Sequence, residues 1–151
     1  MKIINNMQTT KNMKNQRKIL PFYSLILCLL LTVKAHAVTA LSAITPPENY
    51  ENIYVHALGS DQYASEYIVF VKKAVKAHYH AEHTELVYVL EGTGIMQLGE
   101  QQKQVKAGDF IRINQGVIHS VKVTSDKAMK VLSIQTPEFK GKDRIFIDDN
   151  Q

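Results

Sequence analysis

Three histidines and one glutamate carry the clearest chemical signal in this chain. His78, His80 and Glu85 lie in one short stretch, and His119 follows in a separate segment. Alternate side chains of a β-strand share a face, so His78 and His80 are expected to point the same way. Glu85 begins an apolar run, 85–90, that predicts a strand. Imidazole and carboxylate donors together suit Mn, Fe, Ni, Cu or Zn, whereas an all-oxygen set would indicate Mg or Ca. The spacing therefore predicts one mononuclear transition-metal site.

The clustering of histidines supports this interpretation, because a single His-x-His pair is common on protein surfaces. Four of the six histidines of the chain fall between His78 and His119. The fourth of them, His83, follows His80 in a predicted turn. We therefore expect His83 to be a solvated loop residue and not a metal ligand.

The pattern around these residues resembles the two motifs of the cupin family. The first motif is Gly, five residues, His-x-His, three or four residues, Glu, six residues, Gly, and it is matched from His78 to Gly92. The second motif is Gly, five residues, Pro-x-Gly, two residues, His, three residues, Asn, and it is matched at Gly108, Gly116 and His119. Residues 93–107 separate the motifs. Three positions depart from the family pattern: Lys72 stands where the first Gly is expected, Asn114 where Pro is expected, and Val123 where Asn is expected. The resemblance covers about residues 65–135. It implies a jelly-roll β-barrel that holds a metal inside through His78, His80, Glu85 and His119.

The first 37 residues are expected to direct export. They contain six basic residues and no acidic one, followed by an apolar run at 19–33 and by Ala35-His36-Ala37. These features are typical of a secretory signal peptide cleaved after Ala37, with Ala40 as a close alternative and with Met7 or Met13 as alternative starts. A retained membrane anchor would need about 20 apolar residues, more than this run offers. A lipoprotein signal is excluded because Leu27, which is not small, precedes Cys28.

Removal of this segment changes the charge balance. The whole chain has 18 basic and 14 acidic residues, and subtraction of the six basic residues of 1–37 leaves 12 against 14, or about −2. No basic run or stripe remains, so nucleic-acid binding has no support. Cys28 is the only cysteine, so residues 38–151 cannot form a disulfide. We expect the exported protein to be held by its core, a metal or a partner chain.

The pattern downstream predicts one all-β domain at residues 51–148, preceded by an extended arm at 38–50 that contains Pro46-Pro47. Short β-like runs alternate with turn residues, and no amphipathic helix or internal repeat is apparent. Many short strands with regular turns favour a sandwich or a closed barrel, and jelly rolls belong to this class. The expected strands are 53–58, 65–73, 77–80, 85–90, 94–98, 102–105, 110–113, 118–123, 129–134 and 144–147.

Strand parity predicts what surrounds the site. If Glu85 faces the metal, Val87 and Val89 share its inward face, and an apolar lining suits a dry site. The opposite face then carries Leu86, Tyr88 and Leu90, which is too apolar for a solvated exterior. We expect either the N-terminal arm or a second subunit to cover it, and we predict a homodimer.

The chemistry of such a site admits two classes of function. Three imidazoles and one carboxylate leave two positions open on an octahedral metal, which could take water, dioxygen or a pair of substrate oxygens. The first hypothesis is a dioxygenase-like or isomerase-like enzyme acting on a small oxygen-rich organic molecule. The second is a binding or sensing module with a structural metal, since fold alone does not decide between them. Tyr67, Gln97 and Gln135 are candidates for further polar groups, but the sequence assigns no catalytic residue.

Overall fold

The computed structural model describes residues 38–147, so the expected signal peptide at 1–37 lies outside the described residues. The all-β prediction is confirmed: apart from a single 3₁₀ turn at Leu41–Ala43, the regular structure of the described part consists of strands. The strands are β1 (Ile53–Ser60), β2 (Ser65–Val71), β3 (Ala74–Tyr79), β4 (Thr84–Glu91), β5 (Thr93–Leu98), β6 (Gln101–Lys106), β7 (Phe110–Ile113), β8 (His119–Val123), β9 (Met129–Thr136) and β10 (Ile145–Phe146). Within residues 38–147, no helix has the length and apolar character needed to cross a membrane.

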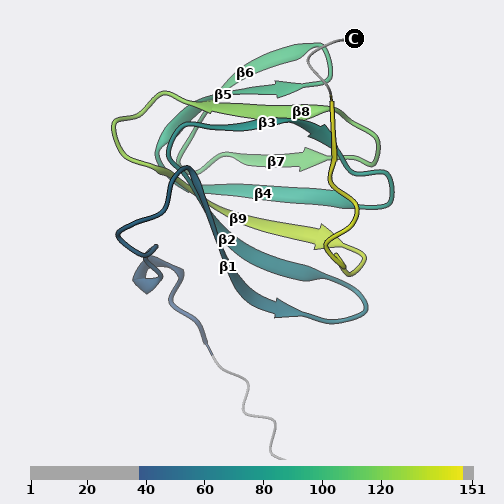
Figure 1. Ribbon diagram of the computed structural model, residues 1–151, viewed down its shortest axis with the longest axis horizontal. Helices are drawn as coiled ribbons and strands as arrows, with labels where there is room; N and C mark the ends of the chain where they lie inside the picture. The colour runs from purple at the N-terminus through teal and green to yellow at the C-terminus, as the bar shows by residue number, and fades with distance from the viewer. Residues whose placement is uncertain (1–37, 148–151) are drawn as a thin grey trace, which may run out of the picture. The chain divides into compact units, whose positions relative to one another are not determined.

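The strands form two antiparallel five-stranded sheets that face each other (Figure 1). One sheet has the order β1-β2-β9-β4-β7 and the other has the order β10-β3-β8-β5-β6. Neighbours in each sheet are mostly not consecutive in sequence, which is the pattern of a jelly roll rather than of a simple meander. The expected fold is therefore confirmed.

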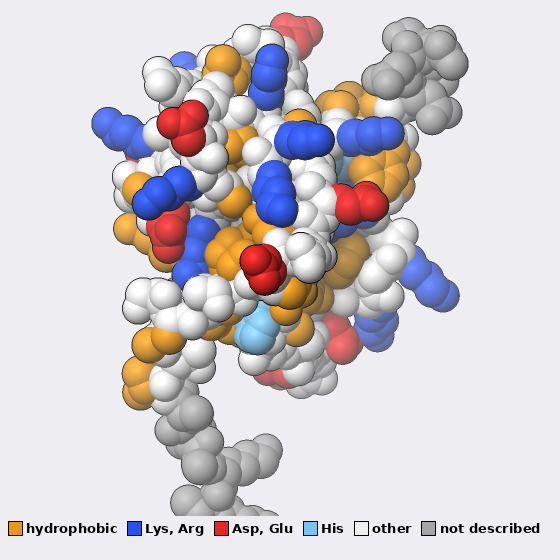
Figure 2. Space-filling model, turned by 60° about the vertical axis from the view of Figure 1, so that its left-hand side comes forward, with side chains coloured by type: hydrophobic (Ala, Val, Ile, Leu, Met, Phe, Trp, Pro, Cys, Tyr) orange, Lys and Arg blue, Asp and Glu red, His pale blue; other side chains and the backbone are white. Residues whose placement is uncertain are grey.

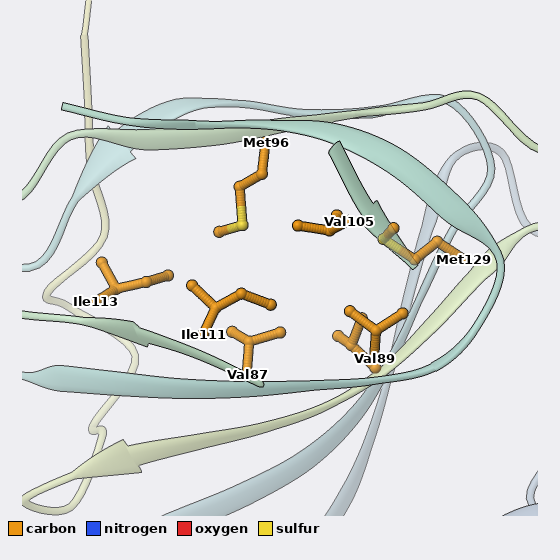
Figure 3. Packing of buried hydrophobic residues seen from close by; sticks show 8 residues of the cluster. Val87, Val89, Met96, Val105, Ile111, Ile113 and Met129 are labelled. Carbon is orange, nitrogen blue, oxygen red and sulfur yellow. The ribbon is translucent and has the colours of Figure 1, made fainter. Parts of the chain in front are cut away.

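The core lies between the two sheets. Strand alternation places one face of each strand inward, and the inward residues are aliphatic. Figure 3 shows Met96 and Val105 pointing from one sheet toward the apolar side chains of the other: Val87, Val89, Ile111 and Ile113. Val87 and Val89 are both buried, as strand parity predicts. This apolar layer occupies the part of the barrel adjacent to the histidines.

The structure accommodates each departure from the cupin motifs. Lys72 is exposed, and its ammonium group donates to the carbonyl oxygen of Tyr50 and lies 4.0 Å from the centre of the Tyr50 ring. Val123 packs against the core. The turn before His119 forms with Asn114 in place of proline, because Gly116 has a positive φ of 74° and its N–H donates to the His80 carbonyl at 2.7 Å.

The N-terminal arm contacts the outward face of the first sheet. Lys130 of β9 is buried, and its ammonium group donates to the carbonyl oxygens of Leu41 and Ile44 at 2.8 Å each. The same sheet face remains open farther along, where Tyr88 is 41% exposed and Phe110 is 63% exposed. The arm therefore reaches β9 but leaves these two aromatic side chains in contact with solvent.

A C-terminal strap, defined here as residues 137–147, runs from the end of β9 across the strand ends to β10 (Figure 1, yellow). It joins the second sheet through the antiparallel pairing of Ile145 with Tyr79 and of Phe146 with His78. The strap thus lies beside the first two histidines of the cluster.

Charged side chains of both signs are interspersed on the face drawn in Figure 2, with apolar side chains exposed between them.

Candidate metal centre

The two sheets bring His78, His80, Glu85 and His119 together. His78 lies in β3 and pairs directly with His119, the first residue of β8. His80 was expected to be the last residue of its strand, but β3 ends one residue earlier, at Tyr79. Glu85 lies on β4 in the opposite sheet. One donor atom from each residue lies within 4.8 Å of the others, so the group could hold a metal ion.

Main-chain carbonyl groups fix the orientation of all three imidazoles. The Nδ1 atoms of His78, His80 and His119 lie 2.8, 2.6 and 2.9 Å from the carbonyl oxygens of Lys76, Asp143 and Val117, respectively. A carbonyl oxygen can only accept, so each Nδ1 carries the proton and each Nε2 of the neutral ring keeps a lone pair. Hydrogen bonding of the non-ligating nitrogen is the usual way in which proteins orient metal-binding histidines.

Two of these Nε2 atoms have no partner. His80 Nε2 and His119 Nε2 are buried and make no hydrogen bond with the described residues. They lie 3.5 and 3.3 Å from Oε2 of Glu85, while Oε1 of Glu85 accepts a hydrogen bond from the Ser133 hydroxyl. Buried polar atoms without partners are costly. A cation shared between two imidazole lone pairs and a carboxylate oxygen would satisfy them, so these residues fit a transition metal.

The protonation states at this group favour ligation. Burial, together with the neighbouring His119, lowers the pKa of His78 to about 4, so the ring is neutral at pH 7. Burial raises the pKa of Glu85, but the close contacts with His119 and His80 and the hydrogen bond from Ser133 outweigh it and hold that pKa well below the usual range. His78 thus offers a neutral imidazole and Glu85 an ionised carboxylate, the forms that bind metals.

The expectation that His83 is solvated is wrong. His83 is buried, because its Nδ1 is hydrogen-bonded to the Asp143 carboxylate and its Nε2 lies 2.9 Å from the Glu138 carbonyl oxygen. Both ring nitrogens face acceptors, so both must be protonated to make these bonds. Burial lowers the pKa of His83, but these hydrogen bonds and the charge of Asp143 raise it by more. His83 is therefore an imidazolium ion paired with Asp143, and neither nitrogen is free to bind a metal.

Asp143 ties the strap to the loop that carries the ligands. Besides His83, its carboxylate accepts hydrogen bonds from the main-chain N–H groups of Ala81, Glu82 and His83 at 2.9–3.1 Å. Its carbonyl oxygen accepts from His80. Sequence reasoning missed this residue, because Asp143 lies about 60 residues beyond the loop and no local pattern marks it. Ser133 was missed for the same reason.

A cavity of about 270 Å³ lies between the sheets, next to His78, Glu85 and His119. Its walls are mostly valine, isoleucine and methionine side chains. His78, Glu85 and His119 also line it, and the remaining polar lining residues are Tyr67, Ser120, Ser133, Gln135 and Arg144. Of the three polar candidates named from the sequence, Tyr67 and Gln135 therefore face the cavity. Gln97 instead donates from its side-chain amide to the carbonyl oxygen of Gly99.

Comparison with known proteins agrees with this architecture. The cupin domain family matches residues 67–135. An uncharacterized protein of Aquifex aeolicus is 35% identical over 98 residues, which cover 65% of this chain and 80% of that protein. Quercetin 2,3-dioxygenase of Bacillus subtilis is 40% identical over 48 residues, which are 32% of this chain but only 14% of that enzyme. The crystal structure of an uncharacterized conserved protein from Klebsiella pneumoniae, with a double-stranded beta-helix domain, superposes with a TM-score of 0.63 and 14% identity over 73% of this chain and 97% of that one. On its sequence motifs, its two-sheet fold and these matches, the chain belongs to the cupin family.

Proposed function

We propose that this protein is an exported, metal-dependent cupin enzyme of dioxygenase-like or isomerase-like type that acts on a small oxygen-rich organic molecule. The observation that carries the proposal is the pair of buried Nε2 atoms, on His80 and His119, that converge without partners beside Glu85 Oε2. A divalent transition metal held by these residues and His78 would polarise a carbonyl or enol oxygen as a Lewis acid.

The residues around the cluster contribute exclusion of water and fixed geometry. Val87, Val89 and Val121 line the cavity, and an apolar wall strengthens electrostatic interactions with a bound substrate. Ser133 holds one oxygen of Glu85, which leaves the other directed at His80 and His119. The local similarity to a quercetin dioxygenase supports an oxidative reaction but covers a small part of that enzyme.

Turnover decides between this proposal and the second candidate. Metal-loaded protein is expected to consume oxygen or release an isomerised product with at least one compound among catechols, flavonols and diketones. Glu85→Gln removes the anionic donor, and we expect turnover to fall by at least about tenfold, the lower end of the cost of disturbing a metal site. Glu82→Gln, a change at an exposed neighbouring glutamate, should leave turnover intact.

A non-catalytic binding module is the second candidate, favoured by one feature of the cavity. Apart from the proposed ligands, the ionisable side chains that line it are Tyr67 and Arg144, neither of which is an ordinary general base at pH 7. Binding of a ligand without product under air, together with an effect of Glu85→Gln on affinity alone, would favour this module over the enzyme.

Export is proposed from the sequence, with cleavage after Ala37. The supporting features are the six basic residues, the apolar run at 19–33 and the Ala-x-Ala site. Mass spectrometry of the periplasmic or secreted protein should give a chain that begins at Val38. An intact N-terminus on protein found only in the cytoplasm would contradict this, and a chain that begins at Leu41 would indicate cleavage after Ala40.

We also propose a homodimer that covers the open outward face of β4 and β7. Tyr88 and Phe110 are paired neighbours on that face, and both are exposed. Burial of a large apolar side chain is favourable by about 1.5–3 kcal/mol. Light scattering should give twice the chain mass, and Tyr88→Glu should give a monomer, whereas Tyr63→Glu, a change at another exposed tyrosine, should not. A monomeric wild type at high concentration would contradict the homodimer, because residues 38–51 leave Tyr88 and Phe110 exposed.

A further inference from the structure

The walls of the cavity are asymmetric in charge. Among the residues that line it, the ionised side chains are Glu85, which belongs to the proposed metal site, and Arg144. A divalent metal with three neutral imidazoles and one carboxylate carries a net charge of +1, and Arg144 adds a second positive charge. Arg144 is an exposed residue that lines the cavity, and this excess of positive charge favours an anionic occupant.

The register of the strap explains why Arg144 faces the site. Phe146 pairs with His78, and the two rings lie 5.8 Å apart, centre to centre. Alternate residues of an extended segment share a face, so Arg144 points to the same side as Phe146, one step beyond the pairing of Ile145 with Tyr79. Within residues 38–147, no carboxylate forms an ion pair with Arg144.

Gln135 provides a second, independent sign of a ligand. Its side chain is 2% exposed and lines the cavity, and its Oε1 atom accepts no hydrogen bond from the described residues. Gln135 is the direct strand neighbour of Glu85, so this oxygen lies on the metal side of the cavity. A buried amide oxygen without a partner favours a ligand that brings a hydrogen-bond donor, such as a hydroxyl group.

We propose that the occupant is a small hydroxylated organic acid. Its carboxylate is bound by Arg144, and its hydroxyl groups are directed at the single metal ion of the proposed site and at Gln135. This inference rests on the proposed function and gives that function a substrate class. A guanidinium group can bind a carboxylate with two parallel hydrogen bonds, which makes Arg144 the residue that determines the charge preference of the site.

A matched pair of probes tests this proposal without turnover. The probes are 3,4-dihydroxybenzoate and 3,4-dihydroxybenzamide, which share the two chelating hydroxyl groups and differ in charge. Calorimetric titration of zinc-loaded protein avoids oxidation, because zinc has no redox chemistry. The wild type should bind the carboxylate about tenfold more tightly than the amide. Arg144→Gln should abolish that preference and leave the amide affinity unchanged, and Arg144→Lys should restore part of it.

Two further variants separate recognition of charge from a general effect on the strap. Lys142→Gln removes a neighbouring exposed cation that does not line the cavity, and it should keep the preference for the carboxylate. Gln135→Met should weaken both probes alike. Circular dichroism and zinc stoichiometry should match the wild type in the Arg144 and Lys142 variants, which shows that the fold and the metal site are intact.

The outcomes separate this inference from the function on which it rests. Equal affinity of the wild type for both probes, or a carboxylate preference that survives in Arg144→Gln, overturns the role of Arg144. If both probes bind equally well without zinc, chelation of the metal ion is overturned. The preference for the carboxylate then still measures the role of Arg144. Failure of both probes to bind overturns the hydroxylated acid as occupant, whereas the proposed function is overturned only if catechols, flavonols and diketones all give no turnover.

Discussion

The double variant His78→Ala/His80→Ala is expected to retain essentially no metal, whereas the wild type should hold one divalent transition metal per chain. It removes two of four converging donors. Loss of a residue that merely supports a metal ligand costs about 10–100-fold in affinity, so loss of two ligands should cost more. Elemental analysis after dialysis against a weak chelator provides the measurement.

A stability measurement complements the elemental analysis. Saturating metal at about 100 times its dissociation constant should stabilise the wild type by about 2.7 kcal/mol and raise its melting temperature. The double variant should show no such shift. His56→Ala is the matched control, because His56 lies on β1 outside the cluster and should leave metal content unchanged. Full metal occupancy in the double variant would remove His78 and His80 from the ligand set.

Replacement of Asp143 by alanine is expected to destabilise the protein and weaken metal binding together. The change leaves His83 and three main-chain N–H groups without their acceptor. Unsatisfied buried donors cost about 1–3 kcal/mol each before relaxation, so we expect the free energy of unfolding to fall by about 2–4 kcal/mol. Metal affinity should fall by about 10–100-fold, because the strap also orients His80.

Urea unfolding of the metal-free protein, followed by circular dichroism because the chain has no tryptophan, measures the loss of stability. Asp126→Ala, a change at an exposed aspartate in the turn between β8 and β9, is the control and should cost little. An Asp143→Ala protein as stable as this control would contradict the anchoring role. Loss of stability with unchanged metal affinity would separate the strap from the metal site.

The stability difference between the wild type and Asp143→Ala should depend on pH in a defined way. Burial raises the pKa of Asp143, but hydrogen bonds from His83 and the main chain hold it below its usual value of 3.8, so its contribution disappears as pH falls below that value. The pKa of His83 is raised above 6.5, so its contribution is complete below pH 6.5 and disappears as pH rises through the raised value. The difference should be largest between about pH 4 and 6.5.

The fold and the four converging residues could be predicted from the sequence because their signals are local. Each strand of the structure overlaps a predicted one, since alternation of apolar residues and glycine-rich turns operates over a few positions. The spacing of His78, His80 and Glu85 depends on a single loop, and His119 follows from its turn at Gly116. The predicted end of β3 was one residue too late, which did not alter the position of His80 in the cluster.

The rest of the site depends on contacts between distant segments, and these leave no periodic trace. His83 was predicted to be solvated because it lies in a turn, but it is buried by its contacts with Asp143 and Glu138 on the strap. Arg144 enters the cavity only because a two-residue strand, β10, adds to the edge of β3. The strand itself was predicted at 144–147, but no local pattern shows that it pairs with β3.

Main-chain carbonyl groups accept the hydrogen bonds of the three imidazoles, and this determines which neighbouring positions tolerate substitution. At positions 76 and 117 only a carbonyl oxygen matters, so replacement of Lys76 or Val117 leaves the ring orientation of His78 or His119 unchanged as long as the strands keep their path. Position 143 differs, because there the side chain secures the segment whose carbonyl holds His80. Substitutions should therefore accumulate at 76 and 117 much more readily than at 143.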